Sequence, residues 1–184
     1  MQRLGIPTLA VMISLSVSTQ PTEAGDVNFF LGQKQLEGEF DPIQEQPEFG
    51  AQITVGPRDW PVKIAIDILA SSDDDRVAGV EIEASTSEID VGARRIWIKG
   101  KARPFFGGGL ALVNAELQTA VPPFVIEDDD SGVGLWISGG AFWRIGARFN
   151  VGVEARISRA EVKFFGRDTE VGGEHFGVLL GWGW

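Results

Sequence analysis

The sequence has no cysteine, and this absence removes several classes of protein at once. Disulfide scaffolds, thiolate nucleophiles, cysteine-ligated zinc sites and iron–sulfur centres all need that side chain. Only one histidine, His175, is present, so a metal centre built on several histidines is excluded, and no metal site or cofactor is expected. A catalytic triad that uses histidine would have to be built on His175.

Positive charge is also scarce, and tyrosine is absent. The chain carries 16 Lys and Arg against 26 Asp and Glu, a formal net charge of −10, which argues against nucleic acid as the main partner. Glycine accounts for 24 of the 184 residues, nearly twice the average share of roughly 7%. A chain of this length is expected to form one domain.

The N-terminal segment has the features of an export signal. A short basic start that includes Arg3 precedes an apolar run over residues 4–17, and small residues lead to Ala24. The run fits a signal peptide and is shorter than the roughly 20 residues of a membrane-spanning helix. We expect residues 1–24 to be a cleaved signal peptide and residues 25–184 to be the mature domain; a buried N-terminal helix is the alternative.

Alternation of apolar and polar residues dominates the mature chain. In residues 149–158 every odd position is apolar and every even position is polar, charged or glycine. A period of two is typical of a β-strand with two different faces. Similar or weaker patterns predict eight strands, at residues 26–34, 49–55, 62–69, 88–94, 103–117, 132–144, 149–158 and 175–184.

This alternation by itself permits a soluble sandwich, or a lipocalin-like barrel with an apolar interior. Strands of about ten residues favour a membrane barrel instead, because tilted spanning strands need 9–11 residues and soluble strands usually have five or six. The non-apolar face also carries both signs of charge in near balance, as a narrow lumen filled by ion pairs would need. The predicted lumen charges are Lys34, Lys63, Asp67, Glu88, Asp90, Arg94, Glu116, Glu154 and Arg156.

The connections between the predicted strands alternate strictly between long and short. Short turns at one end and long loops at the other are typical of outer-membrane barrels. The long connections are residues 35–48, 71–87, 118–131 and 159–171, and the short ones are residues 56–61, 98–102 and 145–148. Five tryptophans fall at the short-turn end and predict an aromatic girdle in the membrane interface: Trp60, Trp97, Trp143, Trp182 and Trp184.

A sheet in lipid must close on itself, since no backbone group can be left unpaired there. Eight strands enclose a lumen just wide enough to be filled by side chains, and Trp136 and Phe142 share the lumen side of their strand. We therefore predict an all-β fold, a closed antiparallel eight-stranded up-and-down transmembrane β-barrel in the outer membrane of a Gram-negative-type bacterium.

Three stretches carry a resemblance to a known family: RPFFGGGL at residues 103–110, FNVGVEAR at 149–156 and the terminal FGVLLGWGW. With them, the mature chain resembles the small eight-stranded outer-membrane barrels of the OmpA/OmpX-like, porin-family type. The resemblance implies that the barrel-assembly machinery reads the last strand, which here ends in Trp184 rather than the commoner Phe. It does not imply one activity, because the family includes structural, adhesive, channel and enzymatic members.

Three groups of residues are candidates for sites. His175 could serve an acyl-transferring enzyme that modifies lipid A, but no His-x-Ser motif is present, and a lumen or rim histidine paired with a loop carboxylate is the favoured interpretation. The acidic runs at residues 73–75 and 127–130 are expected in external loops as solvated charge; Ca²⁺ or Mg²⁺ bridging to lipopolysaccharide is the alternative. Lys99, Lys101, Arg144 and Arg148 are expected to anchor the short-turn end in the interface.

These observations predict a non-enzymatic integral outer-membrane protein with a structural or surface-interaction role, a plugged lumen and acidic external loops. The expected partners are outer-membrane lipids, lipopolysaccharide and the barrel-assembly machinery; no nucleic acid is expected, and the protein is expected to be a monomer. A narrow channel for small solutes and a lipid-modifying enzyme remain the alternatives.

Overall fold

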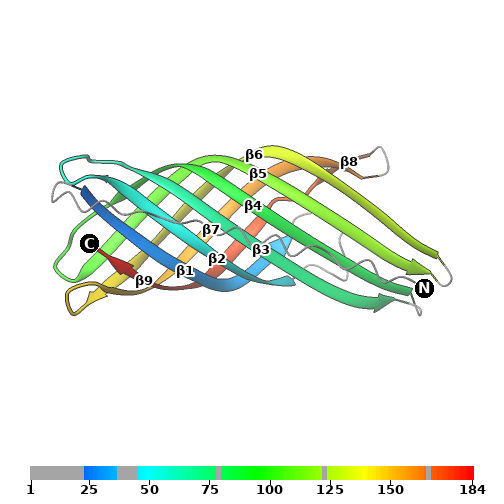
Figure 1. Ribbon diagram of the computed structural model, residues 1–184, viewed down its shortest axis with the longest axis horizontal. Coiled ribbons are helices and arrows are strands. Elements are labelled where there is room, and N and C mark those ends of the chain that lie inside the picture. Colours follow the sequence, from blue (N-terminus) through cyan, green and yellow to red (C-terminus); the bar gives the residue numbers. More distant parts are fainter. Residues whose placement is uncertain (1–22, 37–44, 78–79, 122–123, 165–166) are drawn as a thin grey trace, which may run out of the picture.

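A computed structural model describes residues 23–36, 45–77, 80–121, 124–164 and 167–184, and it shows an elongated β-barrel (Figure 1). Among these residues no helix is long and apolar enough to cross a membrane. The strands are β1 (Glu23–Leu36), β2 (Glu45–Pro57), β3 (Lys63–Val77), β4 (Val80–Ile96), β5 (Ala102–Val121), β6 (Phe124–Ile145), β7 (Phe149–Phe164), β8 (Arg167–Glu170) and β9 (Gly173–Gly183).

All strand pairs are antiparallel, and the sheet closes on itself. β1 to β7 pair in sequence order, β9 pairs with β7, and β1 pairs with β9, so that Phe29 lies opposite Leu180. β8 pairs with the far end of β7 and continues the line of β9 after a break of two residues. The predicted closed antiparallel barrel of eight strands is therefore confirmed, with β8 and β9 forming the eighth strand.

One end of the barrel, which we call the short-turn end, holds three tight connections at residues 58–62, 97–101 and 146–148. Gly100 and Gly146 adopt φ values of 64° and 62°, a left-handed conformation that glycine reaches without strain. The short connections were predicted at these places. Both described ends of the chain also lie here, since the Trp184 N–H donates to the Gly25 carbonyl at 3.0 Å.

The opposite end, which we call the long-hairpin end, differs from the prediction. Residues 71–87 and 118–131 were expected to be loops, but β3 extends to Val77 before β4 begins at Val80, and β5 extends to Val121 before β6 begins at Phe124. The acidic runs at 73–75 and 127–130 therefore lie on strands, and the expectation of loops there is wrong. The sequence is polar at consecutive positions over residues 71–76 and 127–131, so the alternation that marks a strand in the apolar band is lost there. Residues 1–22 of the predicted signal peptide, residues 1–24, lie outside the described residues, and Glu23 and Ala24 begin β1.

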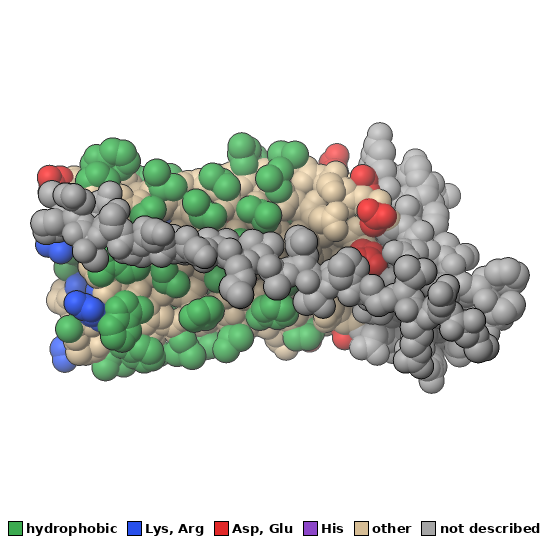
Figure 2. Space-filling view, viewed as in Figure 1, with side chains coloured by type: hydrophobic (Ala, Val, Ile, Leu, Met, Phe, Trp, Pro, Cys, Tyr) green, Lys and Arg blue, Asp and Glu red, His purple; other side chains and the backbone are tan. Residues whose placement is uncertain are grey.

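The outer surface of the barrel wall is apolar (Figure 2). On β7 the odd positions point outward, with Val153 52% exposed, while even positions such as Glu154 are buried. The same arrangement on the other strands leaves many large apolar side chains exposed around the barrel. A soluble monomer rarely exposes a contiguous apolar patch larger than a few hundred Å². The belt includes Phe29, Leu31, Phe49, Ile64, Ile66, Ile68, Ile89, Val91, Phe106, Leu110, Leu112, Val133, Leu135, Ile137, Val153, Ile157, Phe176, Val178 and Leu180.

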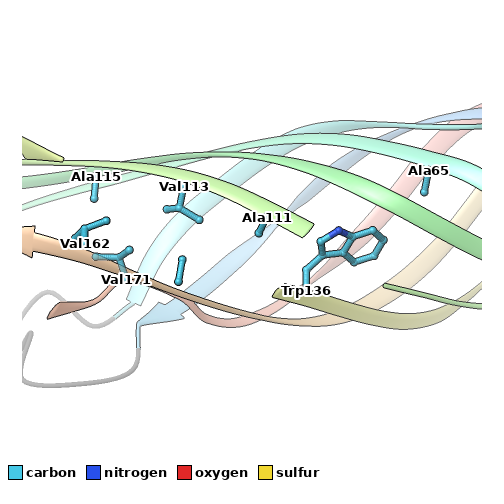
Figure 3. Close-up of a cluster of buried hydrophobic side chains, with 8 residues drawn as sticks. Ala65, Ala111, Val113, Ala115, Trp136, Val162 and Val171 are labelled. Carbon is cyan, nitrogen blue, oxygen red and sulfur yellow. The ribbon is translucent and has the colours of Figure 1, made fainter. Parts of the chain in front are cut away.

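Two apolar clusters occupy the interior. Trp136 of β6 belongs to a cluster with small side chains of β3, β5 and β7 and with Val171, between β8 and β9 (Figure 3): Ala65, Ala111, Val113, Ala115, Ala160, Val162 and Val171. Nearer the short-turn end a second cluster contains Phe30, Leu69, Phe105, Phe142 and Leu179. Gly140 makes room for this cluster, because a Cβ atom there would lie 2.8 Å from Phe105 Cζ.

Candidate functional site in the barrel lumen

A buried guanidinium forms the centre of the polar lumen. Arg156 on β7 forms ion pairs with Asp67 and Asp90, and its Nη2 lies 3.1 Å from Glu154 Oε1. Arg94 adds a second cation, with its Nη2 2.6 Å from Asp67 Oδ2. These five side chains are at most 3% exposed. Because desolvated charges are costly without partners, this pairing is what makes a charged barrel interior tolerable.

Trp136 contacts both cations of this network. The guanidinium carbon of Arg156 lies 4.8 Å from the centroid of the indole ring, and that of Arg94 lies 5.8 Å away. Arg94 also lies 5.4 Å from the ring centroid of Phe105. Cations over aromatic faces are attracted most strongly where water is excluded. Ion pairs and rings together therefore fill the middle of the lumen.

A second polar layer, around His175, lies toward the long-hairpin end. His175 Nδ1 is 2.8 Å from Glu48 Oε2, and its Nε2 is 3.0 Å from Ser158 Oγ. Ser158 Oγ also donates to Glu88 Oε2 at 3.1 Å, and Glu88 pairs with Lys34 at 3.6 Å. Serine, histidine and a carboxylate in this order match the hydrogen bonding of a hydrolytic triad. However, Ser158 and His175 are both completely buried, and the serine hydroxyl already donates a hydrogen bond to a second carboxylate, Glu88.

A third polar layer closes the short-turn end below the phenylalanine cluster. Arg144 pairs with Asp26 and donates from Nε to Asn150 Oδ1 at 2.7 Å. The Asn150 amide donates in turn to Asp26 and to Asn28, both at 3.0 Å. From the short-turn end, the lumen thus holds the Arg144 layer, the phenylalanine cluster, and then the adjacent Arg156 and His175 networks.

Most of the predicted lumen charges are brought together by the fold. Seven are buried in the lumen, and Lys63 is half-buried at its mouth, where its ammonium donates to the carbonyls of Ala24 and Gly56 at 3.2 Å. Glu116 was placed wrongly: it shares the outward face of β5 with Leu112, because the inward positions hold small apolar residues such as Val113. The seven are Lys34, Asp67, Glu88, Asp90, Arg94, Glu154 and Arg156.

The five predicted girdle tryptophans all lie at the short-turn end with their rings partly exposed. Trp60 is 52% exposed and Trp184 is 36% exposed. Two arginines lie over girdle rings, Arg95 at 5.3 Å from Trp97 and Arg148 at 5.9 Å from Trp182. The remaining member is Trp143, whereas Trp136 and Phe142 lie in the lumen.

Sequence reasoning missed Glu48 as a lumen residue, because it fell in the expected loop over residues 35–48. A signal was present in β2, where every second residue is polar or glycine and four of these five are buried in the lumen. These positions are Gln46, Glu48, Gly50, Gln52 and Thr54.

The fold and lumen define a small closed β-barrel of the outer-membrane type. No family model matches the chain, and no curated protein matches its sequence. Solved structures match its fold. Ail, the attachment invasion locus protein of Yersinia pestis, has a TM-score of 0.61 at 9% identity, over 89% of this chain and 99% of Ail.

Two further barrels show the same likeness. Neisserial surface protein A matches with a TM-score of 0.51 at 13% identity, over 88% of this chain and 94% of that protein. The outer membrane protein OprG of Pseudomonas aeruginosa matches with a TM-score of 0.52 at 8% identity, over 89% of this chain and 96% of OprG. The resemblance to small eight-stranded outer-membrane barrels is therefore confirmed at the level of the fold.

Proposed function

We propose that this protein is an integral outer-membrane barrel with a structural or surface-interaction role and a plugged lumen. The observation that carries the proposal is the inverted distribution of polarity. Large apolar side chains point outward around the barrel, while an ion-paired network centred on Arg156 is buried inside. A lipid solvent favours this arrangement, and water opposes it.

The two ends support one orientation. Short turns and an aromatic girdle are typical of the periplasmic side, and this supports a long-hairpin end outside the cell. The proposed contacts are outer-membrane lipids and lipopolysaccharide around the belt, and the barrel-assembly machinery at β9. The proposed state is a monomer.

The surface interaction that we propose involves cationic partners. The Ail structure contains a heparin analogue, a highly sulfated sugar. The long-hairpin end of this chain carries the acidic runs at residues 73–75 and 127–130, so a polyanion of that kind would be repelled.

Cell fractionation combined with gel mobility before and after heating tests the location. A closed membrane barrel stays with the outer-membrane fraction and migrates faster when unheated than when heated. Recovery of the folded chain in the aqueous fraction without detergent would contradict the proposal.

Conductance in planar bilayers tests the plugged lumen against the alternative of a narrow channel. The wild-type protein is expected to conduct no measurable current, because the Arg156 network and Trp136 fill the lumen. A steady current that disappears on Arg94→Met substitution would favour the channel.

The Ser158–His175–Glu48 arrangement keeps an acyl-transferring enzyme as the second candidate. We expect Ser158→Ala and His175→Ala to leave the lipid A profile of the host unchanged, because no substrate carbonyl can reach the buried hydroxyl. Loss of an acyl modification in both variants, with normal barrel mobility, would favour the enzyme.

A further inference from the structure

The two ends of the barrel carry opposite charge. Half of the 16 lysines and arginines lie at the short-turn end, where Glu23, Asp26 and Asp59 are the acidic residues of the neighbouring sequence. Figure 2 shows Lys and Arg gathered at that end and Asp and Glu mainly at the other. The eight basic residues are Arg58, Lys63, Arg95, Lys99, Lys101, Arg103, Arg144 and Arg148.

Four of these basic residues line a cavity of about 430 Å³ at the mouth of the lumen. The lining comes from β1, β3, β4, β5, β6, two turns and Trp184, so the cavity lies at the short-turn end of the barrel. Its basic residues are Arg58, Lys63, Arg103 and Arg144, and its one acidic side chain is Asp26.

The cavity has an excess of positive charge at its rim and a closed inner end. Asp26 pairs with Arg144, and Lys63 and Arg103 donate to backbone carbonyls, so four cationic side chains share one acidic side chain in the lining. Deeper in the lumen, Phe142 lies 6.0 Å from the Arg144 guanidinium and belongs to the buried phenylalanine cluster. A ligand can therefore enter from the aqueous side and bind, but it meets an aromatic barrier to further passage.

We propose that this mouth binds a phosphate ester of a sugar-sized molecule. A phosphate dianion offers three oxygens to several cations at once, and guanidinium groups match it in geometry. The cavity is several times larger than a phosphate ion and lies at the small end of the range for organic ligands. Trp60, Trp184 and Ile98 supply apolar wall against which a sugar ring can pack. The proposal concerns an aqueous mouth and stands independently of the role of the outer end.

Titration of the full folded chain in detergent micelles with glucose 6-phosphate tests the proposal, with tryptophan fluorescence and calorimetry as readouts. We expect saturable binding that weakens at least tenfold in the Arg58→Ala/Arg103→Ala variant. The matched control is Lys99→Ala/Lys101→Ala, which removes two charges from the same end outside the cavity and is expected to change binding less than twofold. Arg58→Glu, at an exposed turn residue, provides a second variant that leaves the Arg103 contacts with its turn intact.

Titrations with other ligands distinguish a sugar phosphate from inorganic phosphate and from a lipid headgroup. Glucose is expected not to bind, and inorganic phosphate is expected to bind more weakly than the ester. Equal affinity for inorganic phosphate would overturn the sugar assignment. Binding only to phosphatidylglycerol vesicles, an equal loss in the lysine control, or no saturable binding would overturn the proposal. Unheated gel mobility of each variant verifies that the barrel is folded.

Discussion

Replacement of Arg156 by methionine tests whether the lumen network stabilises the barrel. Methionine keeps much of the aliphatic volume but removes the guanidinium that contacts Asp67, Asp90 and Glu154. Removing one partner of a buried ion pair typically costs about 3–5 kcal/mol, because the other charge stays buried without compensation. We expect a loss of that size in the free energy of unfolding.

The structure also predicts which carboxylate causes most of the loss. Asp67 keeps its pair with Arg94, and Glu154 keeps the hydrogen bond from Gln52 Nε2 at 2.7 Å. Arg156 supplies the only cation described at Asp90. The double variant Arg156→Met/Asp90→Asn is therefore expected to recover about 1–3 kcal/mol of the loss, since the uncompensated charge is gone.

Urea unfolding in phospholipid vesicles, followed by tryptophan fluorescence and unheated gel mobility, measures these differences. Arg159→Met is the matched control, because this arginine lies three residues further along β7, on the opposite face of the strand. Its side chain is 68% exposed, and its Nε lies 3.9 Å from Glu170 Oε1. Its expected cost is about 1 kcal/mol or less. If Arg156→Met were no more destabilising than Arg159→Met, the network would not stabilise the barrel.

Three other substitutions test the belt, the packing and the plug. Ile66→Arg is expected to cost about 2–4 kcal/mol in the same assay, against about 0–1 for Trp60→Arg at the interface; equal costs would contradict the proposed membrane position. Gly140→Val is expected to lower stability by about 1–3 kcal/mol, because a Cβ there would clash with the Val153 carbonyl oxygen and the Phe105 ring, and an unchanged stability would contradict this packing. Trp136→Ala is expected to allow swelling of liposomes in small sugars, which the wild-type protein prevents, and unchanged exclusion would show that the ion pairs alone close the lumen.

The part of the fold inside the apolar belt could be predicted because lipid outside and charge inside impose a strict period of two. Residues 149–158 follow this period without exception, and every even position among them is buried. Beyond the belt the sequence loses this alternation, as in the polar run at residues 71–76, so the strand extensions that end at Val77 and Val121 could not be predicted from it.

Contacts across the lumen were beyond sequence reasoning for a different reason. Glu48 and His175 are 127 positions apart and meet only because the register of β1, β2 and β9 brings them to one level. On β5 the interior is lined by alanine and valine, so polarity did not distinguish the two faces and Glu116 was assigned to the wrong one. Register and side-chain size, rather than polarity, decide these positions.

The pairing of β1 with β9 closes the barrel, and the first and last strands are hydrogen-bonded in the same way as the other neighbouring strands. Because Gly25 and Trp184 are hydrogen-bonded neighbours, a short linker can join these two residues. New ends can then be opened at any of the three short turns without loss of a strand pair. Circularly permuted chains are therefore expected to fold into the same barrel, but their C-terminal strand would no longer be the one that ends in Trp184.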